Sequence, residues 1–223
     1  MFFLDCHCHL ADNYFFRNID SLIQDWKKVG LIKIGTMSTN IKSIQRNILL
    51  SQKYPELIVC GIGRHPWGAH KITEKELSQI EKHLIENKNA IIGEVGLDHY
   101  FIKEKEIQEK QIPLFKTFLG MAQKYKRSLM LHMTGAEKNV LELLSSFQPK
   151  VNVCCYWYLG PEKILRELND LGCYFSINPS FMNSKNHRKV MDVVSIERLL
   201  TESDGPVKSQ GKINTPQIIP FLI

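Results

Sequence analysis

The sequence predicts a parallel α/β barrel of eight strands, the (β/α)8 or TIM-type barrel. Short apolar runs alternate along the chain with amphipathic segments of helical period. There are eight such runs in 223 residues, a length typical of one barrel domain. Polar residues of metal-binding type follow the runs and are almost absent inside them. We therefore expect one domain over residues 1–223, with its chemistry at the carboxyl ends of the strands.

The predicted strands are the apolar or β-branched runs, at residues 2–10, 31–36, 57–63, 90–95, 128–132, 151–158, 173–178 and 198–201. The predicted helices lie between them, at 19–28, 41–53, 74–86, 105–126, 136–147, 161–171 and 186–194. After the last strand the chain has only residues 208–223, which Pro216 and Pro220 interrupt. We expect the closing helix to be short or missing, and the apolar surface beneath it to be exposed or covered by a partner.

Composition excludes several classes of protein. The hydrophobic content of 43% and the charged content of 23% are those of a soluble globular protein, and no apolar run approaches a membrane span. The amino terminus shows no signal-peptide pattern, and six cysteines without a framework spacing indicate reduced thiols. We expect a cytoplasmic protein with no membrane partner. A net charge of +6, scattered along the chain, permits a nucleic-acid substrate without requiring one.

The first predicted strand ends in a pair of histidines. Side chains alternate across a strand, so His7 and His9 point the same way and could hold one divalent cation. Cys6 and Cys8 are expected on the opposite face, where they would serve as small packing residues. By themselves the two histidines are equally consistent with an ordinary strand end, so the interpretation depends on partners at later strands.

Polar residues follow four later strands: Arg64 and His65, Glu94, His132, and Asp204. Glu94, His132 and Asp204 form a ligand set with the two histidines. Nitrogen and oxygen donors of this kind suit Zn, Mn or Mg without any thiolate. Glu94 has two oxygens and could bridge two ions, and Asp204 could both bind an ion and take a proton from its water. A bound metal lowers the pKa of water from about 15.7 toward about 7, which gives a nucleophile at neutral pH.

Five sequence blocks resemble, in order, the signature blocks of the TatD-type metal-dependent deoxyribonucleases, in the amidohydrolase-like barrel superfamily. They are LDCHCHL, GIGRHP, IIGEVGLDHY, LMLHMTGAE and TESDGP. The resemblance implies one or two divalent cations (Zn, Mg or Mn) and hydrolysis of phosphodiester bonds in DNA, often from the 3′ end. It implies a set of site residues: His7, His9 and Asp204 on one ion, Glu94 between the ions, His132 on the second, and His65 near the scissile phosphate. Glu94, Asp204 and His65 would be the catalytic residues.

One block departs from the family pattern. The family carries His-x-Phe/Tyr-x-Gly after strand six, where the histidine binds the second ion, and Tyr156 stands in that place here. A neutral phenol with a pKa near 10 is a poor metal ligand, so we expect the second ion to bind weakly or not at all. Cys154 is expected on the same face and could substitute as a sulfur ligand, although packing is the simpler role for it.

Two further blocks, WY-x-GP and YFSINPS, resemble the TatD-like subunit of the bacterial Qat anti-phage defence system. This resemblance implies protein partners encoded by a defence operon, which could complete a divergent site and an incomplete barrel.

Other polar and aromatic residues have simpler interpretations. Arg64 is the best local candidate for a phosphate contact, and Asp98 is expected to organise its loop rather than bind metal. Aromatic residues that could stack on unpaired bases, or simply pack, are Trp67, Trp157 and Tyr158. The remaining histidines are expected at the surface: His70, His83, His99 and His187.

Three functions remain open at this point. A nuclease is favoured. A small-molecule amidohydrolase on the same barrel commonly uses a strand-four lysine to bridge its metals, whereas this chain has Glu94 there. A scaffold or sensor with a decayed site is supported by Tyr156 and the short carboxyl-terminal region, but the other five ligand positions are intact.

Overall fold

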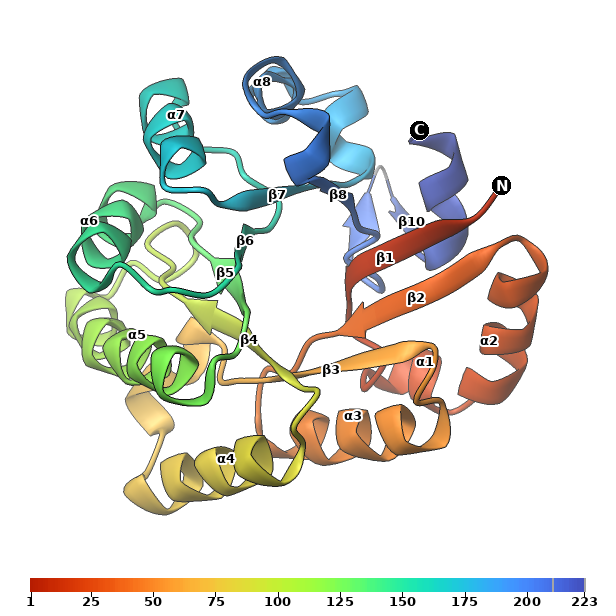
Figure 1. Cartoon of the computed structure of the whole chain (residues 1–223), viewed down its shortest axis with the longest axis horizontal. Coiled ribbons are helices and arrows are strands. Elements are labelled where there is room, and N and C mark those ends of the chain that lie inside the picture. Colours follow the sequence, from red (N-terminus) through yellow and green to blue (C-terminus); the bar gives the residue numbers. More distant parts are fainter. Residues whose placement is uncertain (210, 223) are drawn as a thin grey trace.

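The computed structural model describes residues 1–209 and 211–222. Eight strands form one sheet in the order β1 to β8, and each strand pairs in parallel with the next. Figure 1 looks down the resulting barrel, with the strands around its centre and the helices on the outside. The predicted (β/α)8 fold is therefore confirmed.

The strands are β1 (Phe3–Cys8), β2 (Leu31–Thr36), β3 (Ile58–Ile62), β4 (Ile91–Gly96), β5 (Leu129–His132), β6 (Val153–Cys155), β7 (Tyr174–Ile177) and β8 (Leu199–Thr201). The α-helices are α1 (Asn13–Phe16), α2 (Ile19–Lys28), α3 (Ile41–Lys53), α4 (Glu74–Glu86), α5 (Lys105–Tyr125), α6 (Glu137–Phe147), α7 (Glu162–Asp170) and α8 (Lys185–Val193). Smaller elements are the 3₁₀ helices η1 (Pro66–Lys71), η2 (Pro179–Met182), η3 (Ile196–Arg198) and η4 (Pro216–Phe221), and the hairpin of β9 (Lys208–Ser209) and β10 (Lys212–Ile213).

The predicted elements are found within a few residues of their expected bounds, with one exception. The sixth strand was expected over 151–158 but contains only Val153–Cys155. The chain turns directly after it, and Trp157 adopts a positive φ of 42° that no strand can accommodate. Tyr156 therefore lies in the loop after the strand, at the carboxyl end of the barrel.

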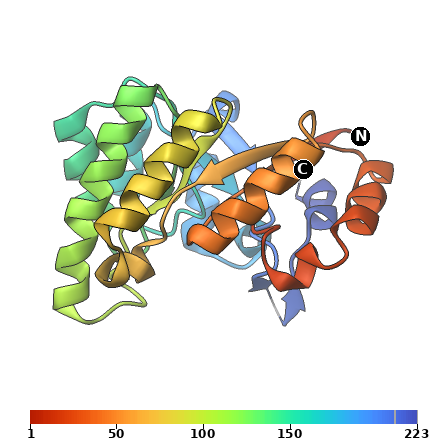
Figure 2. The same ribbon diagram turned by 90° about the horizontal axis from the view of Figure 1, so that it is seen from below.

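Sequence signals at the helix starts explain why several boundaries are well defined. In α3, the Asn40 side chain accepts the Ser43 N–H, and the Ser43 hydroxyl oxygen accepts the Asn40 N–H, both at 3.0 Å. Thr73 and Glu76 form the same reciprocal capping box at the start of α4. These caps satisfy backbone donors that a helix start leaves unpaired. Figure 2 shows α3, α4 and α5 side by side along the outside of the barrel.

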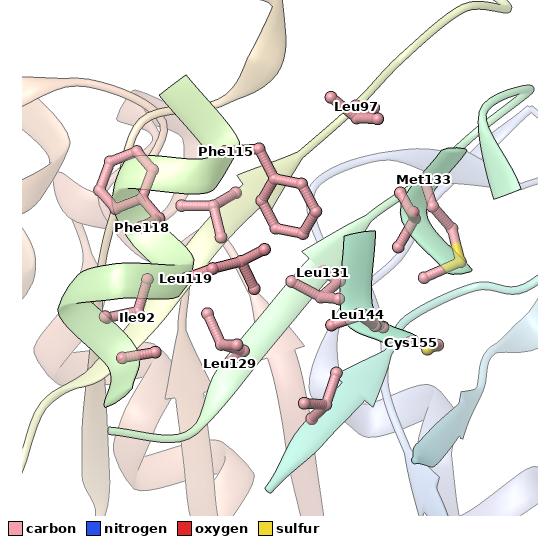
Figure 3. Close-up of a cluster of buried hydrophobic side chains, with 14 of the residues drawn as sticks. Ile92, Leu97, Phe115, Phe118, Leu119, Leu129, Leu131, Met133, Leu144 and Cys155 are labelled. Carbon is pink, nitrogen blue, oxygen red and sulfur yellow. The ribbon is translucent and has the colours of Figure 1, made fainter. Parts of the chain in front are cut away.

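The main hydrophobic core lies between the sheet and its outer helices. In Figure 3, Phe115, Phe118 and Leu119 of α5 face Ile92 of β4 and Leu129 of β5. All five side chains are buried, and each fully buried side chain of this size contributes roughly 1.5–3 kcal/mol relative to exposure. This packing fixes β4 and β5, the two strands that carry Glu94 and His132.

The barrel closes between β8 and β1 through contacts other than a strand ladder. The Thr201 hydroxyl donates to the Leu4 carbonyl at 2.6 Å, and the His9 N–H donates to the Gly205 carbonyl at 2.7 Å. The short helix η4 packs beside β1 and buries Ile219 (Figure 1). The closing helix is therefore short, as predicted, and it covers part of the surface beside β1.

One histidine expected at the surface is buried. His187 has no exposed surface, and its ring contacts the Ser180 hydroxyl and the Ser176 carbonyl. It is the third residue of α8, in the first turn, and α8 packs against β7.

None of the helices in the described ranges is both long enough and apolar enough to cross a bilayer.

Candidate metal centre

Four side chains converge at the carboxyl end of the barrel. The Nε2 atoms of His7 and His9 lie 3.3 Å apart. Asp204 Oδ1 lies 3.4 Å and 3.3 Å from these two nitrogens, and Glu94 Oε2 lies 3.5 Å and 3.6 Å from them. Donors that share one ion at about 2.0–2.2 Å are typically separated by roughly 3–4 Å. We call these four residues the first ligand group; their spacing suits one divalent cation.

The first ligand group contains an unsatisfied buried oxygen. Asp204 Oδ1 is buried and accepts no hydrogen bond of normal geometry from the described part of the chain, although it faces two imidazoles. An unpaired carboxylate oxygen in the interior is costly, and a cation among these donors would remove that cost. The residues present therefore fit a metal ion.

The backbone of β1 is shaped by a buried carboxylate. Asp5 Oδ1 accepts the N–H of His7 at 3.2 Å and the N–H of Ser203 at 3.0 Å. Asp5 thus joins the end of β1 to the loop after β8. The His7 carbonyl in turn accepts the Asp204 N–H at 2.9 Å. These three contacts hold His7 and Asp204 together although they are far apart in the sequence.

The expectation that Cys6 and Cys8 share the face away from the histidines is only half right. Cys8 is buried in the outer core, but Cys6 packs against Met130 and Cys154, inside the barrel. The reason is an irregularity in β1, whose register against β2 shifts between Asp5 and Cys8, so simple alternation fails there.

A second ligand group lies on the other side of Glu94. Glu94 Oε1 is 3.1 Å from His65 Nε2 and 2.9 Å from His132 Nδ1. The two oxygens of Glu94 therefore face different sets of imidazoles, as a bridging carboxylate requires. His65, expected beside the scissile phosphate, is placed among the potential ligands.

His132 is oriented by a carboxylate on its far side. Its Nε2 lies 2.7 Å from Asp98 Oδ2, which also accepts the Trp67 indole N–H at 2.7 Å. The other oxygen of Asp98 accepts the N–H groups of Tyr100 and Phe101. The expectation that Asp98 organises its loop is therefore met, but sequence reasoning missed its contact with His132. The available signal was a carboxylate four residues after Glu94, at the end of the neighbouring strand.

Tyr156 reaches the place where the family histidine is expected. Its hydroxyl lies 2.8 Å from His132 Nδ1, and its ring lies 4.0 Å from that of His7, between centroids. Burial raises the pKa of Tyr156 well above its usual value, so the phenol is neutral. Cys154 belongs to neither ligand group found among residues 1–209 and 211–222; it packs beside Cys6 and Met130.

The electrostatics of the centre are dominated by one ionised carboxylate among histidines. Burial acts to raise the pKa of Glu94, but His65 and His132 hold it well below its usual value. Burial acts to lower the pKa of His9 and His132, but the carboxylates they touch outweigh it and raise both pKa values to about 9. His65 differs, because burial lowers its pKa. An entering cation would compete with protons on these rings.

A cleft of about 910 Å³ opens above the centre. His9, Glu94 and Asp204 form part of its floor, and Trp67 and Trp157 line its sides together with Arg64. Arg64 is partly buried, donates to the Gly68 carbonyl at 3.3 Å, and leaves its Nε without a hydrogen bond in the described residues. Tyr158 does not line this cleft, because it is buried and its hydroxyl donates to the Pro161 carbonyl.

Curated relatives resemble this chain over nearly its whole length. An uncharacterized metal-dependent hydrolase of Mycoplasma genitalium is 30% identical over 241 residues, covering 100% of this chain and 89% of the relative. One from Methanocaldococcus jannaschii is 29% identical over 225 residues, covering 99% and 86%. The human deoxyribonuclease TATDN3 is 25% identical over 220 residues, covering 94% and 80%.

Solved structures share the fold, and a family model matches the sequence. The TatD homologue YJJV of Escherichia coli superimposes with a TM-score of 0.89 at 23% identity, covering 99% of this chain and 87% of that one. A TatD-family hydrolase of Entamoeba histolytica gives a TM-score of 0.84 at 22% identity, covering 95% and 77%. The family model described as "TatD related DNase" matches residues 4–222. The chain therefore belongs to the TatD-related DNase family of metal-dependent hydrolases.

Proposed function

We propose that this hydrolase cleaves phosphodiester bonds in DNA. The observation that carries the proposal is the position of Glu94, whose two oxygens each face a separate group of nitrogen donors. A centre of this form suits displacement at phosphorus, where charge develops on both the attacking and the leaving oxygen. The name of the human relative, deoxyribonuclease TATDN3, supports DNA as the substrate.

In this proposal His7, His9 and Asp204 hold the first ion with Glu94, and His132 and Glu94 hold the second. A bound divalent cation, Zn, Mg or Mn, would supply a water of lowered pKa and stabilise charge on the phosphate. Asp204 Oδ1 faces the two histidines of the first ion, so its second oxygen, Oδ2, would receive the proton of the attacking water.

His65 and Arg64 would bind the substrate phosphate in this proposal. His65 Nε2 points toward Glu94 at 3.1 Å, and its ring stands at the floor of the cleft. Arg64 brings a permanent positive charge to the lining of the same cleft. Both side chains therefore line the cleft in which the phosphodiester would bind.

The decisive experiment compares metal content and cleavage in one preparation. Wild-type protein, Glu94→Gln and the surface control Glu109→Gln would be loaded with Mg, Mn or Zn and given single-stranded DNA. We expect metal-dependent cleavage by the wild type and the control, and loss of cleavage in Glu94→Gln. Bound metal in the wild type without cleavage of DNA would contradict the proposal.

A second candidate function is favoured by Tyr156, which puts a neutral phenol beside His132. The protein would then be a catalytically weakened scaffold or sensor that works with partner proteins in bacterial anti-phage defence. The WY-x-GP and YFSINPS blocks support this role, and all six free cysteines suit a reducing cytoplasm. Cleavage by the isolated protein at the rate of the partner-bound form would argue against it.

A further inference from the structure

Three aromatic side chains form one wall of the cleft above the metal centre. Trp67, Tyr100 and Phe101 line the cleft, and 47%, 59% and 60% of their surfaces are exposed. The rings of Trp67 and Phe101 meet edge to face at 5.5 Å, and those of Tyr100 and Phe101 at 4.9 Å. We call these three residues the aromatic wall. Large aromatic rings this exposed, and gathered beside a reactive centre, indicate a binding surface.

The aromatic wall is held in place by the carboxylate that orients His132. Asp98 accepts the indole N–H of Trp67 at 2.7 Å and the backbone N–H groups of Tyr100 and Phe101 at 2.9 Å and 2.7 Å. The wall therefore has a fixed position relative to the second ligand group. Trp67 also meets His65 edge to face, with ring centroids 4.8 Å apart.

Positive charge accompanies the aromatic wall. Arg64 and Lys71 line the same cleft, and Lys103 Nζ lies 5.0 Å from the centre of the Tyr100 ring. Outside the ligand groups, Glu137 is the acidic residue that lines this cleft among those the structure describes. Exposed aromatic rings interleaved with basic side chains suit a ligand that combines flat apolar groups with negative charge. A nucleic-acid strand with unpaired bases has this combination.

We propose that the aromatic wall is a stacking platform for one unpaired nucleobase of the strand whose phosphate lies at the metal centre. This inference rests on the proposed function. Bases in a duplex are covered by their neighbours, so a platform of this kind accepts a single strand or an unpaired end. Because the wall touches His65, a base stacked on it lies next to the reacting phosphate. Phe101 and Trp67 are then substrate-positioning residues.

The test measures binding separately from cleavage. Metal-loaded protein would bind phosphorothioate-linked oligothymidylate, which resists hydrolysis, and the same strand with one abasic residue at each position in turn. In the wild type, one abasic position should weaken binding by roughly 5- to 150-fold, which corresponds to a stacking energy of about 1–3 kcal/mol. Phe101→Leu should bind the intact strand more weakly than the wild type does. In this variant, an abasic residue at the sensitive position should weaken binding much less than in the wild type.

The matched control is Phe221→Leu, the same change at a ring that is 78% exposed and lies outside the cleft lining. It should behave as the wild type does. If no abasic position weakens wild-type binding, or if Phe101→Leu leaves the effect intact, the platform is wrong. Position-dependent binding without DNA cleavage would support the platform and contradict the hydrolytic function. Cleavage of DNA, together with binding that no abasic position weakens, would support the hydrolytic function and contradict the platform.

Discussion

His132 Nε2 and Asp98 Oδ2 lie 2.7 Å apart, and both side chains are buried. Burial acts to raise the pKa of Asp98, but hydrogen bonds from His132 and Trp67 lower it to about 2, so the carboxylate is ionised. An ionised Asp98 keeps a proton on Nε2 and turns Nδ1 toward Glu94. Such carboxylate–histidine pairs set the orientation of metal-binding histidines.

Asp98→Asn should weaken metal binding at the second ligand group. The amide can present an N–H to Nε2 and so favour the wrong tautomer of His132, which we expect to lower the affinity roughly 10- to 100-fold. Calorimetric titration with Mn would measure this effect, with the exposed Asp192→Asn as its control. Equal Mn affinity in Asp98→Asn and the wild type would show that Asp98 only organises its loop.

Tyr156→His should strengthen the binding of a second metal ion. The change replaces a neutral hydroxyl beside His132 by an imidazole, the donor that the family pattern carries at this place. Metal content after dialysis should rise toward two ions per chain. Tyr156→Phe, which removes only the hydroxyl, should leave the metal content of the wild type unchanged. Identical stoichiometry and affinity in Tyr156→His would mean that this position does not limit the second ion.

Metal removal should destabilise the protein through the first ligand group. An ion that binds only the folded state stabilises it by about 2.7 kcal/mol when its free concentration is 100 times its dissociation constant. Thermal melts with and without a chelator would show the difference as a shift in Tm. The shift should disappear in His9→Gln and persist in His70→Gln, because His70 lies at the surface. A shift that survives in His9→Gln would place the stabilising ion elsewhere.

His187 should make the fold sensitive to acid. Burial lowers the pKa of His187 below its ordinary 6.5, so the folded state holds the ring neutral while the unfolded chain takes up a proton. Above pH 6.5 His187 is neutral in both states and costs the fold nothing. Below pH 6.5 the free energy of unfolding decreases as the pH falls, by at most about 1.4 kcal/mol per pH unit.

Denaturant unfolding at pH 7.5 and pH 5.5 would measure this acid sensitivity. His187→Gln should be less stable at the higher pH and should lose less stability between the two values than the wild type. The exposed His70→Gln should follow the wild type. A pH dependence that is the same in all three proteins would assign the acid sensitivity to other groups.

Sequence patterns could anticipate the barrel because its signals are local. Apolar runs, helical periods and the capping boxes at Asn40 and Thr73 act over a few residues, and the end of each parallel strand points to the same edge of the sheet. Cys6 and His187 were placed wrongly for the opposite reason. An irregular register in β1 and the packing of α8 on β7 decided their surroundings, and neither is written in the nearby sequence.

The sequence alone determined which residue types gather at the barrel mouth, and that a tyrosine stands where the family has a histidine. Tertiary structure decided which atoms face one another. It turned one oxygen of Glu94 to each ligand group, brought His65 in among the donors, and joined Trp67 to His132 through Asp98. The physical reason is that strand order fixes the neighbourhood, whereas atomic contacts depend on side-chain rotamers and loop turns that only the packed molecule selects.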